Sequence, residues 1–311
     1  MTLVKPKPFP PGATVGLLAP SSPIYEKENY LLAPALLQSL GYRVVEGESC
    51  FAQRGYLAGN DALRAKDLQN MFEDDQIDGI IALRGGSGAS RLLPLLNYES
   101  IQKHPKMFIG FSDITALHCA FQAKCNMVTF HGPMAGHPGQ TGFRDQKSLS
   151  MFLRATGISS PLGEIRNPDN SPFSVFQKGE NRGILTGGNI TVLSQLVGTP
   201  FLPDMKGKIL LLEAIGQKPF EIDAQLMQLK NAGIFDTCAG VLLGDFTKCH
   251  DENRPSLSLT EIFQDLFPKQ IPILANVHAG HGWDKLTLPL NIHYQIKNDR
   301  LFALESASNP L

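Results

Sequence analysis

The sequence predicts an α/β fold of two domains, on three observations. The chain has 311 residues, which favours two domains because most domains hold ~100–200 residues. In the first half, short apolar runs alternate with stretches of helical length, which is typical of a mostly parallel sheet with helices on both faces. This pattern weakens over residues 136–182. We therefore expect an N-terminal α/β domain at 1–135, an inter-domain connection at 136–182 and a smaller mixed α/β domain at 183–311.

Apolar runs, caps and glycine or proline breaks predict the individual elements. The N-terminal strands are expected at residues 14–18, 42–45, 79–83, 107–110 and 127–130. The N-terminal helices are expected at 26–39, at 61–72 behind the cap residue Asn60, from the glycine turn at 84–88 to residue 96, and from 112 to 123. Within the connection, one helix is expected, at 145–156. The C-terminal domain predicts helices at 189–197, 222–232 and 259–267, strands at 208–212 and 240–243, and a β-like end at 288–304.

Charge and composition exclude several classes of protein. The 28 basic and 29 acidic residues give a net charge of −1, so we expect neither a nucleic acid nor an anionic membrane as a partner. No apolar run approaches the ~20 residues of a membrane span, and the N-terminus lacks the apolar core of a signal peptide. We therefore expect a cytoplasmic protein. The five cysteines, an odd number without a CxxC pair, indicate reduced thiols.

A serine stands where an apolar strand gives way to a helix. Residues 107–115 read MFIGFSDIT, so Ser112 lies on the turn between the two elements. A hydroxyl there projects above the sheet, and the helix N-terminus offers N–H groups and partial positive charge to an oxyanion. Ser112 is therefore a candidate nucleophile, and the alternative is a simple helix N-cap. The G-x-S-x-G elbow pattern is not matched, because Ile114 occupies the second glycine position.

A glycine-rich turn follows the strand predicted at 79–83. Residues 84–88 read RGGSG, and such a turn can bring backbone N–H groups close to a ligand. Neighbouring parallel strands would put it beside Ser112. It lacks both the GxGxxG pattern and the Lys-Ser/Thr pair of a phosphate loop, so we expect no dinucleotide. The alternative is a plain tight turn.

A serine nucleophile needs a base, and the base needs an acid that orients it. Of the eight histidines, His281 is the best candidate, because glycines on both sides let its loop approach another domain closely. His131, at a strand end, is a second. Glu213 follows the apolar run 208–212, where a carboxylate is costly unless paired, although a solvated strand end is the alternative. No metal is expected, since His278 and His281 lack a third ligand.

Together, these segments resemble the LD-carboxypeptidase family of serine peptidases, whose members include murein tetrapeptide carboxypeptidases and microcin-immunity amidases. The matching motifs stand in family order and cover nearly the whole chain. They are YLAG at 56–59 with Asp61 and Arg64, RGG at 84–86, GFSDIT at 110–115, HGP at 131–133, GGN at 187–189, GTP at 198–200, Leu212-Glu213, GIF at 233–235, Gly280-His281 and Leu288-Pro289.

The resemblance implies a two-domain α/β fold, often dimeric, with a Ser-His-Glu triad and neither a metal nor a cofactor. Carried over by motif, Ser112 is the nucleophile, His281 the general base and Glu213 the acid that orients the base. The backbone N–H groups of Asp113 and Gly86 would form the oxyanion hole. We therefore also expect a homodimer.

The sequence departs from the family pattern at four positions. Ala214 and Gln217 replace usual acids, Ser87 replaces a usual tyrosine, and Asn291 replaces a usual glycine. The triad residues are intact, so these departures bear on the choice of substrate rather than on catalysis. Loss of two acids would weaken the attraction for the free amine of a diamino acid.

The resulting expectation is a serine LD-carboxypeptidase that removes the terminal D-amino acid from murein tetrapeptides, for peptidoglycan recycling. Its partner would be a small peptide, whose free carboxylate needs N–H donors or a cation. The candidate substrate-binding residues are Arg84, Gly85, Ser87 and His131, with a plain surface charge as the alternative for Arg84. Two other functions stay open. One is an amidase of the same mechanism acting on a toxic peptidyl- or aminoacyl-nucleotide, and the other is a catalytically silent peptide-binding protein.

Overall fold

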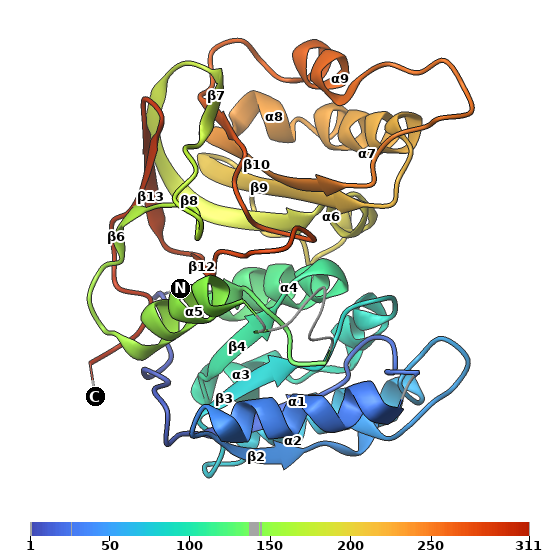
Figure 1. Cartoon of the computed structure of the whole chain (residues 1–311), viewed down its shortest axis with the longest axis vertical. Coiled ribbons are helices and arrows are strands. Elements are labelled where there is room, and N and C mark those ends of the chain that lie inside the picture. The colour runs from blue at the N-terminus through green and yellow to red at the C-terminus, as the bar shows by residue number, and fades with distance from the viewer. Residues whose placement is uncertain (1, 26, 137–142, 144, 311) are drawn as a thin grey trace.

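The computed structural model describes residues 2–25, 27–136, 143 and 145–310. Two β-sheets lie one above the other, the lower formed mainly by the N-terminal half and the upper by the C-terminal half, and each is flanked by helices (Figure 1). This confirms the predicted α/β fold with a mostly parallel N-terminal sheet. Glu26 of the first predicted helix, and residues 137–142 and 144 of the predicted connection, lie outside the described residues.

Six strands form the first sheet, in the order β12-β5-β4-β3-β1-β2. They are β1 (Thr14–Leu18), β2 (Arg43–Glu46), β3 (Gly79–Ala82), β4 (Met107–Gly110), β5 (Thr129–His131) and β12 (Leu288–Leu290). Strands β1 to β5 run parallel, as their apolar runs predict. Strand β12 pairs antiparallel with β5, with Leu288 opposite His131. The C-terminal half thus supplies an edge strand to the N-terminal sheet.

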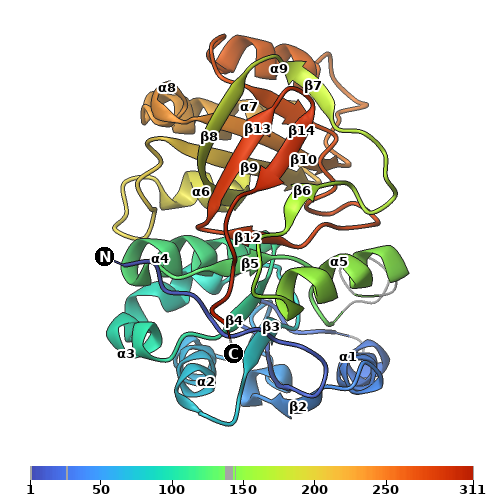
Figure 2. The ribbon, with the colours of Figure 1, turned by 90° about the vertical axis from the view of Figure 1, so that its left-hand side faces the viewer.

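Helices cover both faces of this sheet (Figure 2). They are α1 (Lys27–Ser39), α2 (Asp61–Glu73), α3 (Tyr98–Lys103), α4 (Thr115–Cys125) and α5 (Gln146–Gly157). Side chains alternate along a strand, so Val15 and Ile109 share a buried cluster with α1 and α5. Ile80 and Phe108 share another with α2, α3 and α4. The predicted cap holds, since Asn60 accepts the N–H of Leu63 at 2.8 Å.

One predicted helix is a 3₁₀ helix throughout, and another begins as one. Ala89–Leu95 forms a 3₁₀ helix, η2, with Pro94 inside it; proline lacks the N–H that an α-helix would use there. Ser112–Ile114 forms a second 3₁₀ helix, η3, and α4 starts only at Thr115. Strand β4 is therefore followed by a sharp turn that carries Ser112.

Eight strands form the second sheet, in the order β6-β14-β13-β8-β9-β10-β11-β7. They are β6 (Gly163–Ile165), β7 (Ser174–Gln177), β8 (Glu180–Asn189), β9 (Lys208–Ile215), β10 (Gly240–Thr247), β11 (Ile273–Ala275), β13 (His293–Lys297) and β14 (Arg300–Ala303). Strands β8 to β11 run parallel, and the others pair antiparallel. Within the described chain, this mixed sheet has more strands than the first.

The predicted connection at 136–182 contributes elements to both halves. Helix α5 covers the first sheet, while β6 and β7 form the two outer edges of the second. These strands hold only 3 and 4 residues and are mostly half-buried or exposed, so no apolar run marks them in the sequence. The domain boundaries at 135 and 183 remain a proposal.

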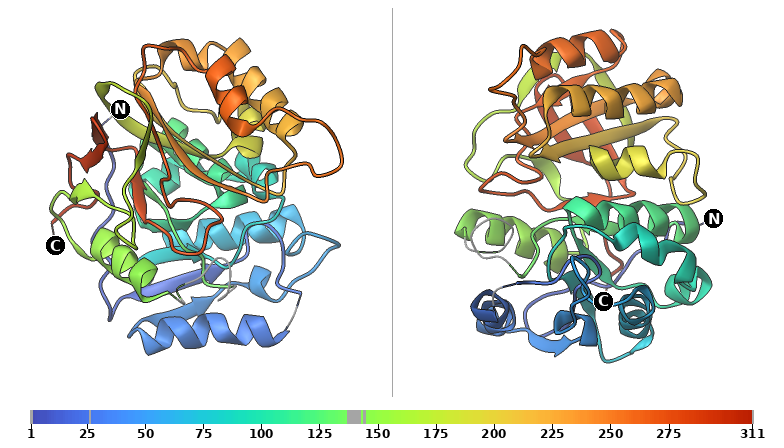
Figure 3. Two further views of the ribbon diagram at one scale, coloured as in Figure 1. Left: turned by 45° about the horizontal axis from the view of Figure 1, so that its top comes forward. Right: turned by 90° about the vertical axis from the view of Figure 1, so that its right-hand side faces the viewer.

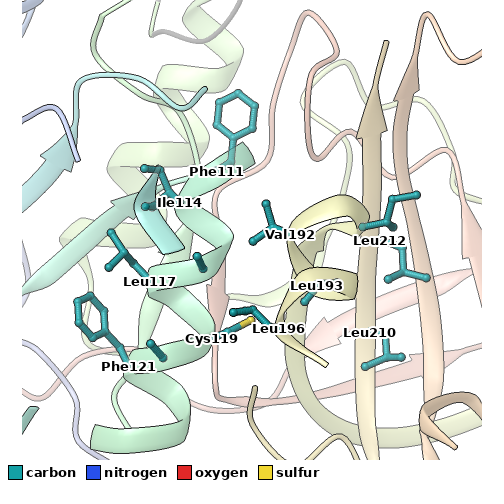
Figure 4. Packing of buried hydrophobic residues seen from close by; sticks show 14 of the residues in the cluster. Phe111, Ile114, Leu117, Cys119, Phe121, Val192, Leu193, Leu196, Leu210 and Leu212 are labelled. Carbon is teal, nitrogen blue, oxygen red and sulfur yellow. The ribbon is translucent and has the colours of Figure 1, made fainter. Parts of the chain in front are cut away.

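An apolar interface joins the two halves. Helix α6 (Ile190–Leu196) lies between α4 and strand β9, and buried side chains fill the space on both of its sides (Figure 4). Helices α7 (Pro219–Asn231), α8 (Ile234–Thr237) and α9 (Leu259–Leu266) pack with α6 on the same face of the second sheet (Figure 3). At this interface Cys119 of α4 lies beside Leu196 of α6, whereas Ile114 and Leu117 lie on the opposite side of α4 (Figure 4). Buried apolar contacts, together with strand β12 in the first sheet, connect the two halves. Nowhere in the described residues does a helix have the length and apolar character needed to cross a membrane.

Candidate active site

Ser112 lies on a strained turn at the carboxyl end of β4. Its φ is +63°, in the left-handed region that residues with a side chain rarely adopt. Gly110 has no room for a side chain, because a Cβ there would lie 2.9 Å from Cγ2 of Ile114. Buried His118 fixes the strand end, since its Nε2 lies 2.9 Å from the carbonyl oxygen of Gly110. Strained backbone of this kind concentrates at functional sites, and here it presents a partly exposed serine.

The glycine turn packs directly against this serine. A Cβ on Gly85 would lie 2.9 Å from Cβ and 3.0 Å from Oγ of Ser112, so only glycine fits. Gly86 has a φ of +115°, which also favours glycine. Among the described residues, neither the Asp113 N–H nor the Gly86 N–H has a hydrogen-bond partner. Both groups are therefore available to bind an oxyanion.

Three polar side chains hold the glycine turn in place. The buried Asp113 carboxylate accepts the Ser21 hydroxyl at 2.6 Å and the Ala89 N–H at 2.8 Å. The Ser22 hydroxyl accepts the Ser87 N–H at 3.1 Å. Burial raises the pKa of Asp113, although the hydrogen bonds that its carboxylate accepts from Ser21 and Ala89 oppose this increase. Ser21 and Ser22 follow strand β1, and their role as supports becomes visible only in three dimensions.

Glu213 and His281 form a hydrogen-bonded pair. Glu213 Oε2 lies 2.7 Å from Nδ1 of His281. Glu213 is fully buried, and within the described chain its Oε1 has no hydrogen-bond partner. A carboxylate at Nδ1 keeps the proton there, which leaves Nε2 as the nitrogen that can accept one. The pair therefore has the arrangement of a base and the acid that orients it.

The loop that carries His281 is fixed on both sides of the ring. A Cβ on Gly280 would lie 2.9 Å from Oε2 of Glu213, so the backbone approaches the carboxylate more closely than any side chain would allow. The Asp245 carboxylate accepts the Gly282 N–H at 2.9 Å, and the Lys285 ammonium donates to the Gly282 carbonyl. Burial raises the pKa of Asp245 and lowers that of Lys285. The orientation of His281 is therefore set by the backbone as well as by Glu213.

Phe111 connects the serine turn with the histidine. Its ring centroid lies 4.9 Å from that of His281, in an edge-on arrangement, and Phe111 directly precedes Ser112. No hydrogen bond joins Ser112 to His281 in the described part of the chain. The acid–base pair of the C-terminal half thus packs against the residue next to the serine of the N-terminal half.

A cavity of about 360 Å³ opens between the two halves at the serine. One side is formed by the glycine turn and the start of η2, with Gly86, Ser87, Arg91 and Ser112. The opposite side is formed by helix α6 and its cap Asn189, together with the end of β9. The lining is largely polar, which suits a peptide or another polar ligand.

The candidate substrate-binding residues that the sequence offered differ in whether they line this cavity. Ser87 lines the cavity, and Gly85 supports Ser112. Arg84 does not line it, because its guanidinium donates to the Pro23 carbonyl at 3.0 Å and lies 5.7 Å from the ring of Tyr25.

His131 has no access to a ligand in this structure. The residue is fully buried, and neither ring nitrogen has a hydrogen-bond partner among the described residues. Its burial, followed by the charges of His118, His281 and Lys285, holds its pKa well below the usual value. A neutral imidazole packed against Phe111, with ring centroids 5.8 Å apart, is a structural element behind the serine turn.

Arg91 and Asn189 line the cavity but were not singled out by their chemistry in the sequence. Asn189 lies in the GGN motif, and its side chain caps α6 by accepting the Val192 N–H. Arg91 lies one turn beyond the glycines. Only the cavity distinguishes these residues from ordinary surface positions.

One cluster in the described chain has the composition of a metal site. Asp169, His278 and Asp284 offer ligand atoms within 4.8 Å of one another. His278 Nδ1 lies 3.1 Å from Oδ1 of Asp284, so the groups also form an ion pair when His278 is protonated. Neither His281 nor His131 belongs to the cluster, and the Glu213–His281 pair is separate from it.

Activity is expected to survive both chelators and thiol reagents. All five cysteines are buried, and burial raises the pKa of the Cys119 and Cys125 thiols to about 12, so almost no reactive thiolate forms at neutral pH. Hydrolysis should be measured after incubation with EDTA and, separately, with N-ethylmaleimide. Loss of activity in EDTA and its return with zinc would instead implicate the cluster of Asp169, His278 and Asp284 as metal ligands.

Comparison with known proteins identifies the class. Residues 15–132 match the LD-carboxypeptidase N-terminal domain, and residues 182–296 match the LD-carboxypeptidase C-terminal domain. A probable murein peptide carboxypeptidase of Bacillus subtilis (strain 168) is 36% identical, over 92% of this chain and 89% of the relative. The protein is thus a hydrolase of the serine peptidase class. Within that class, the chain belongs to the LD-carboxypeptidase family.

One further relative and one solved structure, both named MccF, indicate the range of the family. The microcin C7 self-immunity protein MccF of Escherichia coli is 27% identical, over 94% of this chain and 92% of the relative. A solved structure of MccF in complex with glutamyl sulfamoyl guanosine has a TM-score of 0.88 at 23% identity, and covers 98% of this chain and 100% of that chain. At this identity, the structural likeness concerns the fold.

Proposed function

We propose that this hydrolase is a serine LD-carboxypeptidase that removes the terminal D-amino acid from murein tetrapeptides. The observation that carries the proposal is the Glu213–His281 hydrogen bond of 2.7 Å, which lies behind Phe111 beside the strained Ser112 turn. The relative in Bacillus subtilis, a probable murein peptide carboxypeptidase, supports this substrate class. The proposal includes a cytoplasmic location and a homodimer, as expected from the sequence.

The proposed reaction runs through an acyl-enzyme. Ser112 Oγ attacks the carbonyl carbon of the bond between the L-centre and the terminal D-residue, while His281 Nε2 takes the hydroxyl proton. The oxyanion is bound by the N–H groups of Asp113 and Gly86. His281 then gives its proton to the leaving amine, and the D-amino acid departs. Water attacks the ester through the same base, which releases the tripeptide and restores the serine. Glu213 holds the imidazole in orientation and stabilises its charged form.

Ser112 and His281 must approach within hydrogen-bond reach for this reaction, ~2.6–3.2 Å. Catalytic hydrogen bonds are often long without substrate and tighten when it binds. The two halves meet through the apolar α4–α6 interface. We therefore expect Ser112 and His281 to approach each other by movement of the His281 loop and the Ser112 side chain, and not by movement of one half relative to the other.

An amidase of the same mechanism, acting on a peptidyl- or aminoacyl-nucleotide, is the second candidate. The likeness to MccF, at 27% identity, favours it. Three of the four departures from the family pattern lie away from the cavity. Ala214 is buried in β9, Gln217 does not line the cavity, and Asn291 bonds to Gln122 and Asn126. Only Ser87 lines the cavity, so these departures give little reason to prefer a nucleotide over a peptide. A silent peptide-binding protein would show no turnover of either.

The free carboxyl terminus is expected to be a requirement of the substrate. We expect kcat/KM for a murein tetrapeptide to exceed that for the same peptide with an amidated C-terminus by about 10–100-fold, since hydrogen bonds to charged groups contribute ~1.5–3 kcal/mol. Mass spectrometry of the released D-amino acid or its amide measures both rates. Equal rates would mean that no carboxylate is recognised, and would favour the amidase. A peptidyl-nucleotide in the same assay tests that alternative directly.

A further inference from the structure

Arg91 stands out among the residues around the cavity. Of the described residues that line it, Arg91 is the one with a positively charged side chain. It lies at the start of η2, beyond the glycine turn, and its side chain is 50% exposed. A half-exposed guanidinium at the entrance of a substrate cavity is either an ordinary surface ion pair or a binding group. The contacts of Arg91 distinguish the two.

Asp61 fixes the plane of this guanidinium and leaves one edge open. Arg91 Nε donates to both oxygens of Asp61 at 2.9 and 3.0 Å, and Nη2 donates to Oδ2 at 2.7 Å. These bonds use the Nε–Nη2 edge. In the described chain, Nη1 makes no hydrogen bond, so the outer edge, formed by Nη1 and the second Nη2 proton, can still bind a carboxylate with two parallel hydrogen bonds.

A second arginine ties this unit to the glycine turn. Arg64 is fully buried and also donates to Asp61. Its Nη1 donates to the Pro20 carbonyl at 2.6 Å and to the Gly88 carbonyl at 2.9 Å. Two guanidinium groups thus share the Asp61 carboxylate, and the inner one is bonded to the turn that carries Gly86. This network holds Arg91 at a fixed place relative to the turn and the serine. An exposed ion pair without the buried Arg64 would not fix its position in this way.

We infer that Arg91 binds the free carboxylate of the substrate's terminal D-residue and so selects a C-terminal peptide bond. The inference rests on the proposed carboxypeptidase function and names the group that recognises the chain end. A guanidinium that offers two parallel hydrogen bonds is a strong and specific partner for a carboxylate, and the outer edge of Arg91 supplies one at the cavity. Arg84, the cation that the sequence offered as a candidate for this role, donates to the Pro23 carbonyl and lies outside the cavity lining.

Binding without turnover gives the direct test. In a Ser112→Ala background, the dissociation constants of a murein tetrapeptide and of its C-terminal amide are measured by calorimetry, with and without Arg91→Ala. We expect Arg91→Ala to weaken binding of the free acid by about 10–100-fold, the range for a charged hydrogen bond. We expect the amide to change by less than about 3-fold. Arg91→Lys, which keeps the charge and loses the two-point geometry, should lie between.

Controls separate this role from general damage. Arg166→Ala removes another guanidinium paired with a carboxylate, Glu164, at 3.0 Å, and Arg166 does not line the cavity. It should leave both dissociation constants unchanged. Equal weakening of acid and amide by Arg91→Ala, or no weakening of either, would overturn the inference. Loss of discrimination in Arg84→Ala rather than in Arg91→Ala would overturn it in favour of Arg84.

Failure of the proposed carboxypeptidase function can be distinguished from failure of the inference about Arg91. If the unsubstituted enzyme releases no D-amino acid from any murein tetrapeptide, the carboxypeptidase proposal fails, and the inference fails with it. If the enzyme releases the amino acid and Arg91→Ala lowers kcat/KM equally for acid and amide, only the inference fails. An increase in KM for the acid with kcat nearly constant supports a binding role.

Discussion

Ser112→Ala is expected to abolish turnover while the protein stays folded. Removal of the nucleophile in serine triads lowers kcat by about 10⁶-fold. The Ser112 hydroxyl makes no hydrogen bond within the described residues, so its removal leaves no buried partner unsatisfied. The measurement is the rate of D-amino acid release from a murein tetrapeptide, alongside the thermal unfolding midpoint of each protein.

A matched control is Ser256→Ala. Ser256 is exposed and bonds only to the neighbouring Leu257 carbonyl in the described chain, and it does not line the cavity. This variant should keep the full rate. Hydrolysis at near the original rate by folded Ser112→Ala would end the serine mechanism and turn attention to a water-based one.

Glu213→Gln is expected to lower kcat by about 10⁴-fold, the effect of the corresponding acid-to-amide change in serine triads. The new amide can present an N–H to Nδ1 of His281, which favours the tautomer with its proton on Nε2. That tautomer cannot take the serine proton. The shape of the side chain is kept, so a folded protein with a nearly unchanged KM should accompany the low kcat.

The pair His293–Glu305 provides the control. His293 Nδ1 contacts Glu305 Oε1 in the same way as the central pair, but His293 is half-exposed and belongs to β13. Glu305→Gln should therefore leave kcat unchanged. If Glu213→Gln retained most of the activity, the carboxylate would have only a structural role, and another acid would have to orient the base.

The fold was predictable where a local pattern carries the signal. The apolar runs of β1 and β4 place both strands within their observed limits, since a buried parallel strand is marked by its own residues. Strands β6 and β7 are short, edge-located and only partly buried, and β12 joins a sheet more than 150 residues away in sequence from its partner β5. Such pairings depend on contacts between distant segments, which local periodicity does not encode.

For the candidate site, the sequence singled out the proposed catalytic residues but not the residues that support them. Chemistry and motif order single out Ser112, Glu213 and His281, and the structure brings the last two into a hydrogen bond. The supports were not visible in the sequence, because Ser21, Asp61 and Asp245 act through partners on other elements. Arg84 illustrates the limit. Its place in the glycine turn made it a candidate for binding, with a plain surface charge as the alternative, whereas its side chain contacts the Pro23 carbonyl and the Tyr25 ring.

Strand β12, which the C-terminal half supplies to the first sheet, affects how the protein folds during its synthesis on the ribosome. At ~5–20 residues per second, residue 288 follows residue 131 by roughly 8–30 s. During that interval, β5 is an open edge with unpaired backbone groups, the kind of surface that invites pairing with other nascent chains. Chaperones have this interval in which to shield it. His281 is synthesised just before β12, so the nascent chain gains its proposed base and the last strand of its first sheet almost together. An incomplete chain that lacks His281 therefore cannot hydrolyse peptides by this mechanism.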